Sequence, residues 1–327
     1  QMCIRDRCIV NPAISEEYVW KSELDPTLPT AQVLVAESAQ ALFPIGTYVP
    51  ETVDQSTTKV IGNVPNKLDS ILGQYSNTDN IQIDIVADSG LSSIFGAVNV
   101  FDDESNAGNV PYDDKQYINL KDAAVFAKYK AGWSSVANTF ITFCEEIRRD
   151  CITIIDLPRA CFVSGKEAKI VDAVDSTFQL NVFNPIKDFT NQLGSSSYAT
   201  TYGNWAKILD IHGAGVTWLP FSGYASAVFG RSDDAANVWA APAGFNRGEF
   251  RNVVDIAINP NQTQRDNLYQ IGVNPVVYFN GEGYTVFGQK TIQTKPTAFD
   301  RINVRRLFLY LERAVARTVK YFVFEPN

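Results

Sequence analysis

The sequence is poor in the residues that build metal centres and disulfide frameworks. Only one of its 327 residues, His212, is a histidine, and no two cysteines form a Cys-x-x-Cys pair. The cysteines are odd in number: Cys3, Cys8, Cys144, Cys151 and Cys161. Neither a zinc site nor a set of disulfides is expected from these spacings, and we expect reduced thiols in a cytosolic setting.

Long apolar runs are also missing. No stretch approaches the roughly 20 apolar residues that span a bilayer, so we expect no direct membrane insertion. Internal repeats and low-complexity tracts are absent as well. A content of 45% hydrophobic and 12% aromatic residues is typical of a globular protein, and a chain of this length can bury a core without disulfides.

Charge is unevenly distributed along the chain. The whole sequence carries −8, but residues 288–327 contain eight basic and three acidic residues, which leaves −13 on the remainder. A cationic end on an acidic body favours contact with an acidic partner, including another copy of the chain; the alternative is a solvated basic helix face. Nucleic acid is not expected as a partner, because the chain is acidic overall.

The basic end contains a predicted amphipathic helix that carries the chain from the segment 298–306 to Tyr321, with Asp300 or Asn303 able to cap its start. One apolar stripe follows the helical period and is expected to be buried: Val304, Leu307, Leu311, Val315 and Phe322. The opposite side carries the four candidate contact residues, which are Arg306, Arg313, Arg317 and Lys320. We expect these cations to be free for a partner protein.

The middle of the chain predicts an α/β layer. A strand is expected at residues 81–86, a helix between Leu120 and Arg149, and a fully apolar strand at residues 151–155, which is typical of a parallel sheet. The residues expected on the buried face of that helix are Trp133, Val136, Phe140, Cys144 and Ile147.

Further elements are predicted on both sides of this unit. A strand is expected at residues 205–209, a helix at residues 222–231 that ends before Asp233, and a hairpin of residues 276–279 and 284–287 around Asn280-Gly281. Residues 8–79 mix short β-like runs with prolines and predict a β-rich segment. Residues 1–7 have the character of a non-native leader.

Several motifs, taken together and in this order, resemble the tail sheath protein of contractile-tailed bacteriophages. The resemblance covers roughly three quarters of the chain and is carried by residues 81–91, 148–158, 220–225, 239–244, 268–275, 286–291, 301–306 and 323–327. It implies an α/β fold with a subtilisin-like sandwich core at residues 80–270. The β-rich segment before the core would end a protrusion domain, and residues 271–327 would start an α+β C-terminal domain.

The resemblance also implies a function and partners. Such a protein is a structural subunit that forms hexameric rings, stacked helically around an inner tail tube, and contracts to drive the tube through the host envelope. Baseplate and tail terminator proteins would be further partners, and the location would be the virion, after assembly in the host cytoplasm. Because relatives continue beyond the position of Asn327, we expect a truncated chain. The alternative is the sheath of a phage-derived bacteriocin or secretion system.

The sequence also contains candidates for chemical sites, which compete with this structural role. Asp156, His212 and Ser222 follow the Asp, His, Ser order of one serine protease class, but His212 lies in a Gly-rich stretch instead of on a helix, and no Gly-Thr-Ser context exists. Residues 283–291 nearly match a phosphate-binding loop, with one residue too many before the lysine. Acidic residues at 102–104 and 113–114 favour a solvated loop over a cation site. We therefore expect no enzyme activity, cofactor or metal.

Overall fold

The computed structural model describes residues 64–78, 81–101, 120, 123–164, 168–169, 178–210 and 215–323. The expected leader, the β-rich stretch up to residue 63, the acidic loop at 102–114 and His212 lie outside the described residues. Within the last part of the expected β-rich segment, residues Val64–Gln74 form helix α5 instead of strands.

The centre of the fold is a four-stranded parallel sheet. Its strands, in spatial order, are β1 (Ile85–Ala87), β2 (Ile152–Asp156), β5 (Ala199–Tyr202) and β9 (Val273–Asn274). Every residue of β2 is buried, and the strand pairs in parallel with β1 on one side and β5 on the other. The prediction of a buried strand in a parallel sheet is confirmed, and the fold is α/β.

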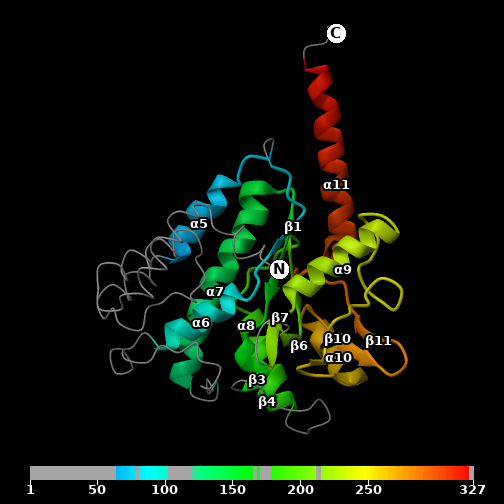
Figure 1. Ribbon diagram of the computed structural model, residues 1–327. Coiled ribbons are helices and arrows are strands. Elements are labelled where there is room, and N and C mark those ends of the chain that lie inside the picture. Colours follow the sequence, from blue (N-terminus) through cyan, green and yellow to red (C-terminus); the bar gives the residue numbers. More distant parts are fainter. Residues whose placement is uncertain are drawn as a thin grey trace, which may run out of the picture.

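Helices cover both faces of this sheet (Figure 1). One face carries α6 (Leu91–Phe101), α7 (Ala123–Thr142), a π-helical turn η5 (Gln179–Phe183) and α8 (Asn184–Thr190), and the other carries α9 (Ser222–Ala235). The alternation along β2 supports both layers, because Ile155 packs in the cluster of Trp133 while Ile154 packs in the cluster of Phe221.

Helix α7 matches the predicted buried face over most of its length. Trp133, Val136, Phe140 and Cys144 are buried, but Ile147 is 48% exposed, so its predicted burial is wrong. The reason is that the chain changes from α-helix to the π-helical turn η3 (Phe143–Arg148). Its hydrogen bonds run from residue i to i+5, which shifts the face that each side chain occupies.

Two smaller antiparallel units flank the main sheet. They are the sheet of β7 (Gly215–Pro220), β6 (Trp205–Asp210) and β8 (Asp255–Ile256), and the hairpin of β10 (Val276–Phe279) and β11 (Gly283–Val286). The predicted strand at 205–209 and the predicted hairpin are confirmed. Helix α9 passes Asp233 without a break and ends at Ala235, four residues beyond the predicted end at Arg231, so the predicted end of this helix is wrong.

Shorter elements complete the described part of the chain. They are the 3-10 turn η4 (Arg159–Cys161), strands β3 (Val163–Ser164) and β4 (Ala168–Lys169), helix α10 (Gln262–Gln270) and the 3-10 turn η6 (Ala298–Asp300). Helix α10 begins with a capping box, in which the side chain of Asn261 accepts from the Gln264 amide and the side chain of Gln264 accepts in return.

Asn204 joins these units at a buried position. Its side-chain amide donates to the carbonyl oxygens of Ile258, at 2.6 Å, and Val276, at 3.2 Å. Its side-chain oxygen accepts from the backbone N–H groups of Trp205, at 3.0 Å, and Ile258, at 3.2 Å. One side chain therefore links the strand β6, the segment after β8 and the hairpin strand β10.

The chain then forms the long helix α11 (Ile302–Val319), followed by the 3-10 turn η7 (Lys320–Phe322). Figure 1 shows that α11 begins against the body and projects away from it toward its C-terminal end. This projection decides which of its side chains can be buried.

Candidate functional site

The first turns of α11 are anchored in the body of the protein. Ile302 and Leu309 are buried in this part of the helix. The guanidinium of Arg305 lies 4.2 Å from the ring centroids of both Tyr198 and Phe299, between two aromatic faces, as is typical of cation–π contacts. It also donates to the hydroxyl oxygen of Ser197. The start of α11 is therefore fixed by apolar packing and by a buried arginine.

The predicted cap of this helix is wrong. Arg301 occupies the N-cap position, and its side chain makes no capping hydrogen bond. Asp300 belongs to the preceding turn η6, and Asn303 lies inside the helix. The 3-10 turn ends at Asp300, so the N-cap falls one residue later and the helix starts two residues later, which the local sequence did not reveal.

Arg306, the first of the four candidate contact residues, is not free for a partner. Its two terminal nitrogens donate to the two carboxylate oxygens of Asp233 at 2.8 and 2.6 Å, and its side chain is only 3% exposed. The guanidinium also lies 5.0 Å from the ring centroid of Phe229. The expectation of an exposed Arg306 is therefore wrong, because a bidentate ion pair holds this residue against α9.

Arg313 and Arg317 also face the body. Arg313 forms an ion pair with Asp84 and donates to the carbonyl oxygens of Ile83, at 3.1 Å, and Asp150, at 2.8 Å. Arg317 donates to the side-chain oxygen of Gln82. Lys320, the fourth candidate, begins the turn η7 at the end of the helix. Most of the predicted cationic face therefore contacts the body of the protein. It holds α11 against the chain segment that precedes β1.

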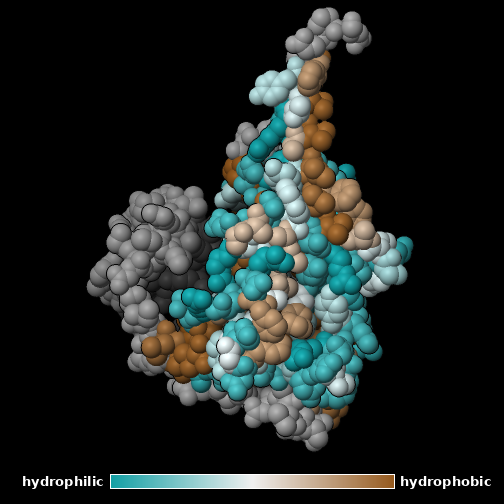
Figure 2. All heavy atoms as spheres, turned by 90° about the vertical axis from the view of Figure 1, so that its right-hand side faces the viewer, coloured by the Kyte–Doolittle hydropathy of each residue, from teal (hydrophilic) through white to brown (hydrophobic). Residues whose placement is uncertain are grey.

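The apolar stripe of α11 is exposed instead of buried. Leu311, Val315 and Phe322, which were predicted to be buried, are 45%, 59% and 65% exposed. Phe308 and Val319 add 41% and 52% exposed side chains, while Val304 and Leu307 are half-buried. Figure 2 shows these hydrophobic residues as a continuous band along the projecting helix. The periodicity was correct, but the face that contacts the body was assigned the wrong way round.

A second polar cluster lies at the carboxyl ends of β1 and β2. Asp156 accepts from the backbone N–H groups of Ser222, at 2.8 Å, and Gly90, at 2.9 Å, and from the hydroxyl of Ser222. Asp88 accepts from the backbone N–H groups of Ser92, at 2.9 Å, and Asp156, at 3.1 Å. The two carboxyl groups thus connect the ends of two strands to the beginnings of α6 and α9.

Burial changes the acidity of both carboxyl groups. It raises the pKa of Asp88 from 3.8 to about 6. Burial, together with the neighbouring Asp88 carboxyl, raises the pKa of Asp156 from 3.8 to about 7. Both aspartates are nearly inaccessible, at 2% and 3% exposure. The cause is the low dielectric environment, which disfavours a charged carboxylate.

Comparison with known proteins gives this geometry a context. The model of the phage tail sheath protein central domain matches residues 119–292, which is more than half of the chain. The chain belongs to the phage tail sheath family. The tail sheath protein of Vibrio phage KVP40 is 34% identical over 195 residues, and that of Enterobacteria phage T4 is 34% identical over 194 residues. The tail sheath protein of Salmonella phage ViI is 30% identical over 203 residues.

The overlap with these relatives is partial. The matched part is 59% of this sheath chain and 29% of the KVP40 and T4 proteins, so the chain spans about a third of the length of its curated relatives. Solved structures similar to it include the contracted helical sheath of an anti-feeding prophage, at 21% identity and a TM-score of 0.42 over 61% of this chain and 46% of that chain. The contracted sheath complex of an extracellular contractile injection system, PVC, has 19% identity and a TM-score of 0.44 over 59% and 47% of the two chains.

The sheath chain brings together two of the three residues of the supposed catalytic triad. The hydroxyl of Ser222 bonds directly to the carboxyl group of Asp156, and the serine is fully buried. In a serine protease the imidazole stands between these two groups, and the serine oxygen is open to substrate. His212 lies outside the described residues. Asp156 and Ser222 therefore form a structural link between β2 and α9.

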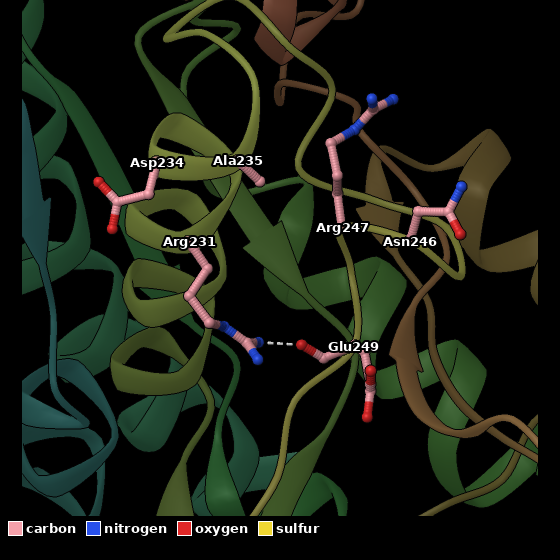
Figure 3. Close-up of a pocket in the computed structure, with 6 residues that line it drawn as sticks. All are labelled: Arg231, Asp234, Ala235, Asn246, Arg247 and Glu249. Carbon is pink, nitrogen blue, oxygen red and sulfur yellow. Dashed lines mark hydrogen bonds between the residues drawn. The ribbon is translucent and has the colours of Figure 1, made fainter.

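The near match to a phosphate-binding loop at residues 283–291 also has a structural explanation, and so does a pocket beside α9. Residues 283–286 are strand β11, and the Lys290 ammonium donates to the Tyr269 carbonyl oxygen at 3.1 Å. Figure 3 shows a pocket of about 390 Å³ between α9 and the segment at 246–249, where Arg231 donates to the Glu249 carbonyl oxygen. Exposed polar side chains line most of it, unlike the apolar cavities that bind small molecules.

Neither a metal cluster nor a membrane span was found in the described part of the sheath chain. No group of three or more His, Cys, Asp or Glu residues there could hold a metal ion. None of the helices described is long and apolar enough to cross a membrane.

The buried carboxyl groups predict an unusual pH dependence. Because the folded-state pKa values of Asp88 and Asp156, about 6 and about 7, exceed 3.8, the folded state holds protons more tightly than the unfolded state. Their contribution to stability is fully present below about pH 4 and is lost as the pH rises through 6 and 7. We expect a higher melting temperature at pH 5.5 than at pH 7.5, measured by circular dichroism in a His212→Asn background.

Asp156→Asn is the comparison variant for this measurement. It removes one of the two titrating carboxyl groups, so the difference between the two melting temperatures should become smaller. An equal melting temperature at both pH values in the parent protein would show that neither carboxyl group has a raised pKa. The histidine is replaced because it is the one ordinary side chain that titrates in this window.

Several residues of this site were not identified from the sequence. Asp88 was visible only as part of a strand end, Asp233 only as the mark of a helix end, and Asn204 carried no signal. The partners of all three residues lie far away in the chain. A polar residue at the carboxyl end of a predicted parallel strand was the available signal for Asp88, since such ends meet at one edge of the sheet.

Proposed function

We propose that the protein is a structural subunit of a contractile phage tail sheath. The observation that carries the proposal is the match of residues 119–292 to the sheath central domain, with relatives named tail sheath proteins at 30–34% identity. Many copies form hexameric rings that stack helically around an inner tail tube, between a baseplate and a tail terminator. The sheath is assembled in the host cytoplasm, becomes part of the virion and contracts during ejection.

The proposal includes the finer architecture. Residues 80–270 form a subtilisin-like sheath core that moves as a rigid body, and residues from 271 onwards begin the C-terminal sheath domain. The parallel sheet between two helical layers supports this assignment. The core has kept no catalytic role, which is supported by the direct bond between the Ser222 hydroxyl and the Asp156 carboxyl group.

Electron microscopy tests the proposed function. The protein, produced together with a tail tube protein, is expected to form rings or cylinders in negative stain. Isolated particles alone, in the presence of assembled tubes, would contradict the proposal. Tubes without sheath at low salt would contradict it most directly, because salt screens charged contacts least under that condition.

The proposed surface for assembly contacts is the apolar stripe of α11 instead of its cationic face. Arg306, Arg313 and Arg317 are engaged within the chain, whereas the stripe of Leu311, Val315 and their neighbours is open. We propose that this stripe packs against further sheath polypeptide. The KVP40 and T4 relatives contain sheath polypeptide outside the matched part, since the match covers only 29% of each protein. Lys320, which begins the turn η7 at the end of the helix, remains a proposed contact residue.

Introducing charge into the stripe should block assembly without unfolding the protein. Leu311→Glu with Val315→Glu removes two apolar side chains whose full burial is worth about 1.5–3 kcal/mol each. We expect at least a 100-fold loss in the extent of sheath formation by the protein, measured by sedimentation of cylinders. The melting temperature of this chain should stay unchanged, because the two side chains are 45% and 59% exposed.

A matched control places two new carboxylates beside the stripe. Ala314→Glu with Ala316→Glu adds the same charge at exposed positions of the same helix. Cylinder formation by this control should resemble that of the parent protein. Normal sheath formation by the Leu311 and Val315 variant would show that the stripe is not a packing surface.

A further inference from the structure

Two buried thiols face each other where the helical layer joins the sheet. Cys144 lies in the turn η3 and Cys151 directly precedes β2, and their sulfur atoms are 3.5 Å apart. Both residues are completely buried, and both are free thiols. They pack with Phe143 in a small apolar cluster of their own. The sheath family match does not assign any role to this pair.

The chain reversal between the two cysteines holds them together. Arg149 adopts a left-handed conformation with φ of 63°, and its N–H donates to the Cys144 carbonyl oxygen at 3.0 Å. The buried side chain of Arg148 binds both carboxylate oxygens of Asp150, at 2.8 and 2.9 Å, and the carbonyl oxygen of Ile81, at 2.8 Å. The two thiols are thus preorganised by a turn that is itself anchored.

We propose that Cys144 and Cys151 form an intramolecular disulfide when the folded protein meets a peroxide. One thiol is oxidised by hydrogen peroxide to a sulfenic acid with release of one water molecule. The second thiol then attacks the sulfenic sulfur, and a second water leaves as the S–S bond forms. Overall, two thiols lose two hydrogen atoms and one peroxide becomes two waters. The sulfur atoms must approach from 3.5 Å to about 2.05 Å, which side-chain rotation can supply.

The surroundings explain why the pair stays reduced until an oxidant is present. The hydrogen bond with Cys151, together with burial, raises the pKa of the Cys144 thiol well above its ordinary value of 9.0. Since the thiolate is the reactive form, oxidation is slow and proceeds through local opening of η3. If the proposed sheath function holds, the thiols persist in the reducing cell and the disulfide forms after release. The chemistry itself does not require assembly.

Peptide mapping tests the proposal directly. Arg148 and Arg149 lie between the two cysteines, so trypsin separates them into the peptides 131–148 and 150–159. The native chain, with Cys3 and Cys8 replaced by serine, is treated with hydrogen peroxide, denatured, alkylated and digested without reduction. We expect mass spectrometry to detect the two peptides joined by a disulfide, and dithiothreitol to separate them.

Cys161 provides the matched control. It is also a buried free thiol, but its pKa is raised by burial alone, and no sulfur contact joins it to the other two cysteines in the described residues. Cys161→Ser should keep the joined peptides, whereas Cys144→Ser and Cys151→Ser should each abolish them. Recovery of both peptides with alkylated or sulfonic acid cysteines would overturn the proposal, as would a disulfide to Cys161.

The melting temperature is a second, independent readout. Closing a loop of this short length should raise it by about 5 °C in the oxidised protein, and reduction should reverse the change. Both measurements use the isolated chain in solution. A negative result would therefore contradict the proposed disulfide and leave the proposed sheath function untouched, because that function is tested by the formation of cylinders.

Discussion

Replacing Asp156 with alanine is expected to lower the free energy of unfolding by about 4 kcal/mol, a large part of the 5–15 kcal/mol that is typical of a folded protein. The variant leaves three buried donors without an acceptor: the backbone N–H groups of Gly90 and Ser222 and the hydroxyl of Ser222. An unsatisfied buried donor costs about 1–3 kcal/mol, and relief from burying a carboxyl group offsets part of the sum.

Chemical denaturation of this chain measures the effect. Asp188→Ala, which removes an exposed aspartate from α8, is the control and should change the unfolding free energy by less than about 0.5 kcal/mol. A small effect of Asp156→Ala would mean that water replaces the carboxyl group, and the proposed link between β2 and α9 would then be wrong.

Replacing Asn204 with alanine is expected to have a similarly large effect, about 4 kcal/mol. The side chain is 1% exposed and makes four hydrogen bonds to backbone groups, so its removal leaves the carbonyl oxygens of Ile258 and Val276 and the N–H of Ile258 without this partner. Because these groups belong to different strands and segments, we expect the antiparallel sheet and the hairpin to separate first, as measured by amide hydrogen exchange in both units.

Two further variants separate hydrogen bonding from shape. Asn204→Asp keeps the size of the side chain but places an oxygen against two carbonyl oxygens, so it should destabilise the protein at least as much as alanine does. Asn191→Ala, at an exposed position, should have little effect. If the aspartate variant were as stable as the parent, the four hydrogen bonds would not be what holds the units together.

Local patterns were a good guide wherever burial depended on neighbours in the sequence. The apolar run at 151–155 gave a buried parallel strand, and the segments around Asn280-Gly281 gave the hairpin. The same method failed at Ile147, since a change to π-helical hydrogen bonding alters the face of a side chain without altering the apolar spacing.

Helix α11 shows where such patterns stop being informative. Its sequence has an apolar side and a cationic side, and a water-soluble helix usually buries the apolar one. Here the cationic side packs against the body. The carboxylates of Asp233 and Asp84 and the carbonyl oxygen of Ile83 accept hydrogen bonds from its guanidinium groups. The apolar side is exposed because the helix projects from the body and meets it with its cationic side.

By itself, the sequence determined the parallel α/β layer, the flanking hairpin, the amphipathic character of α11 and the resemblance to tail sheath proteins. Each of these depends on residues close together in the chain or on motifs in order. Only the tertiary structure decided which side of α11 is buried, that Asp156 bonds to Ser222, and that Cys144 faces Cys151. Contacts such as Arg306 with Asp233, 73 residues apart, and Arg313 with Asp84, 229 residues apart, depend on how distant segments meet, and no local pattern contains that information.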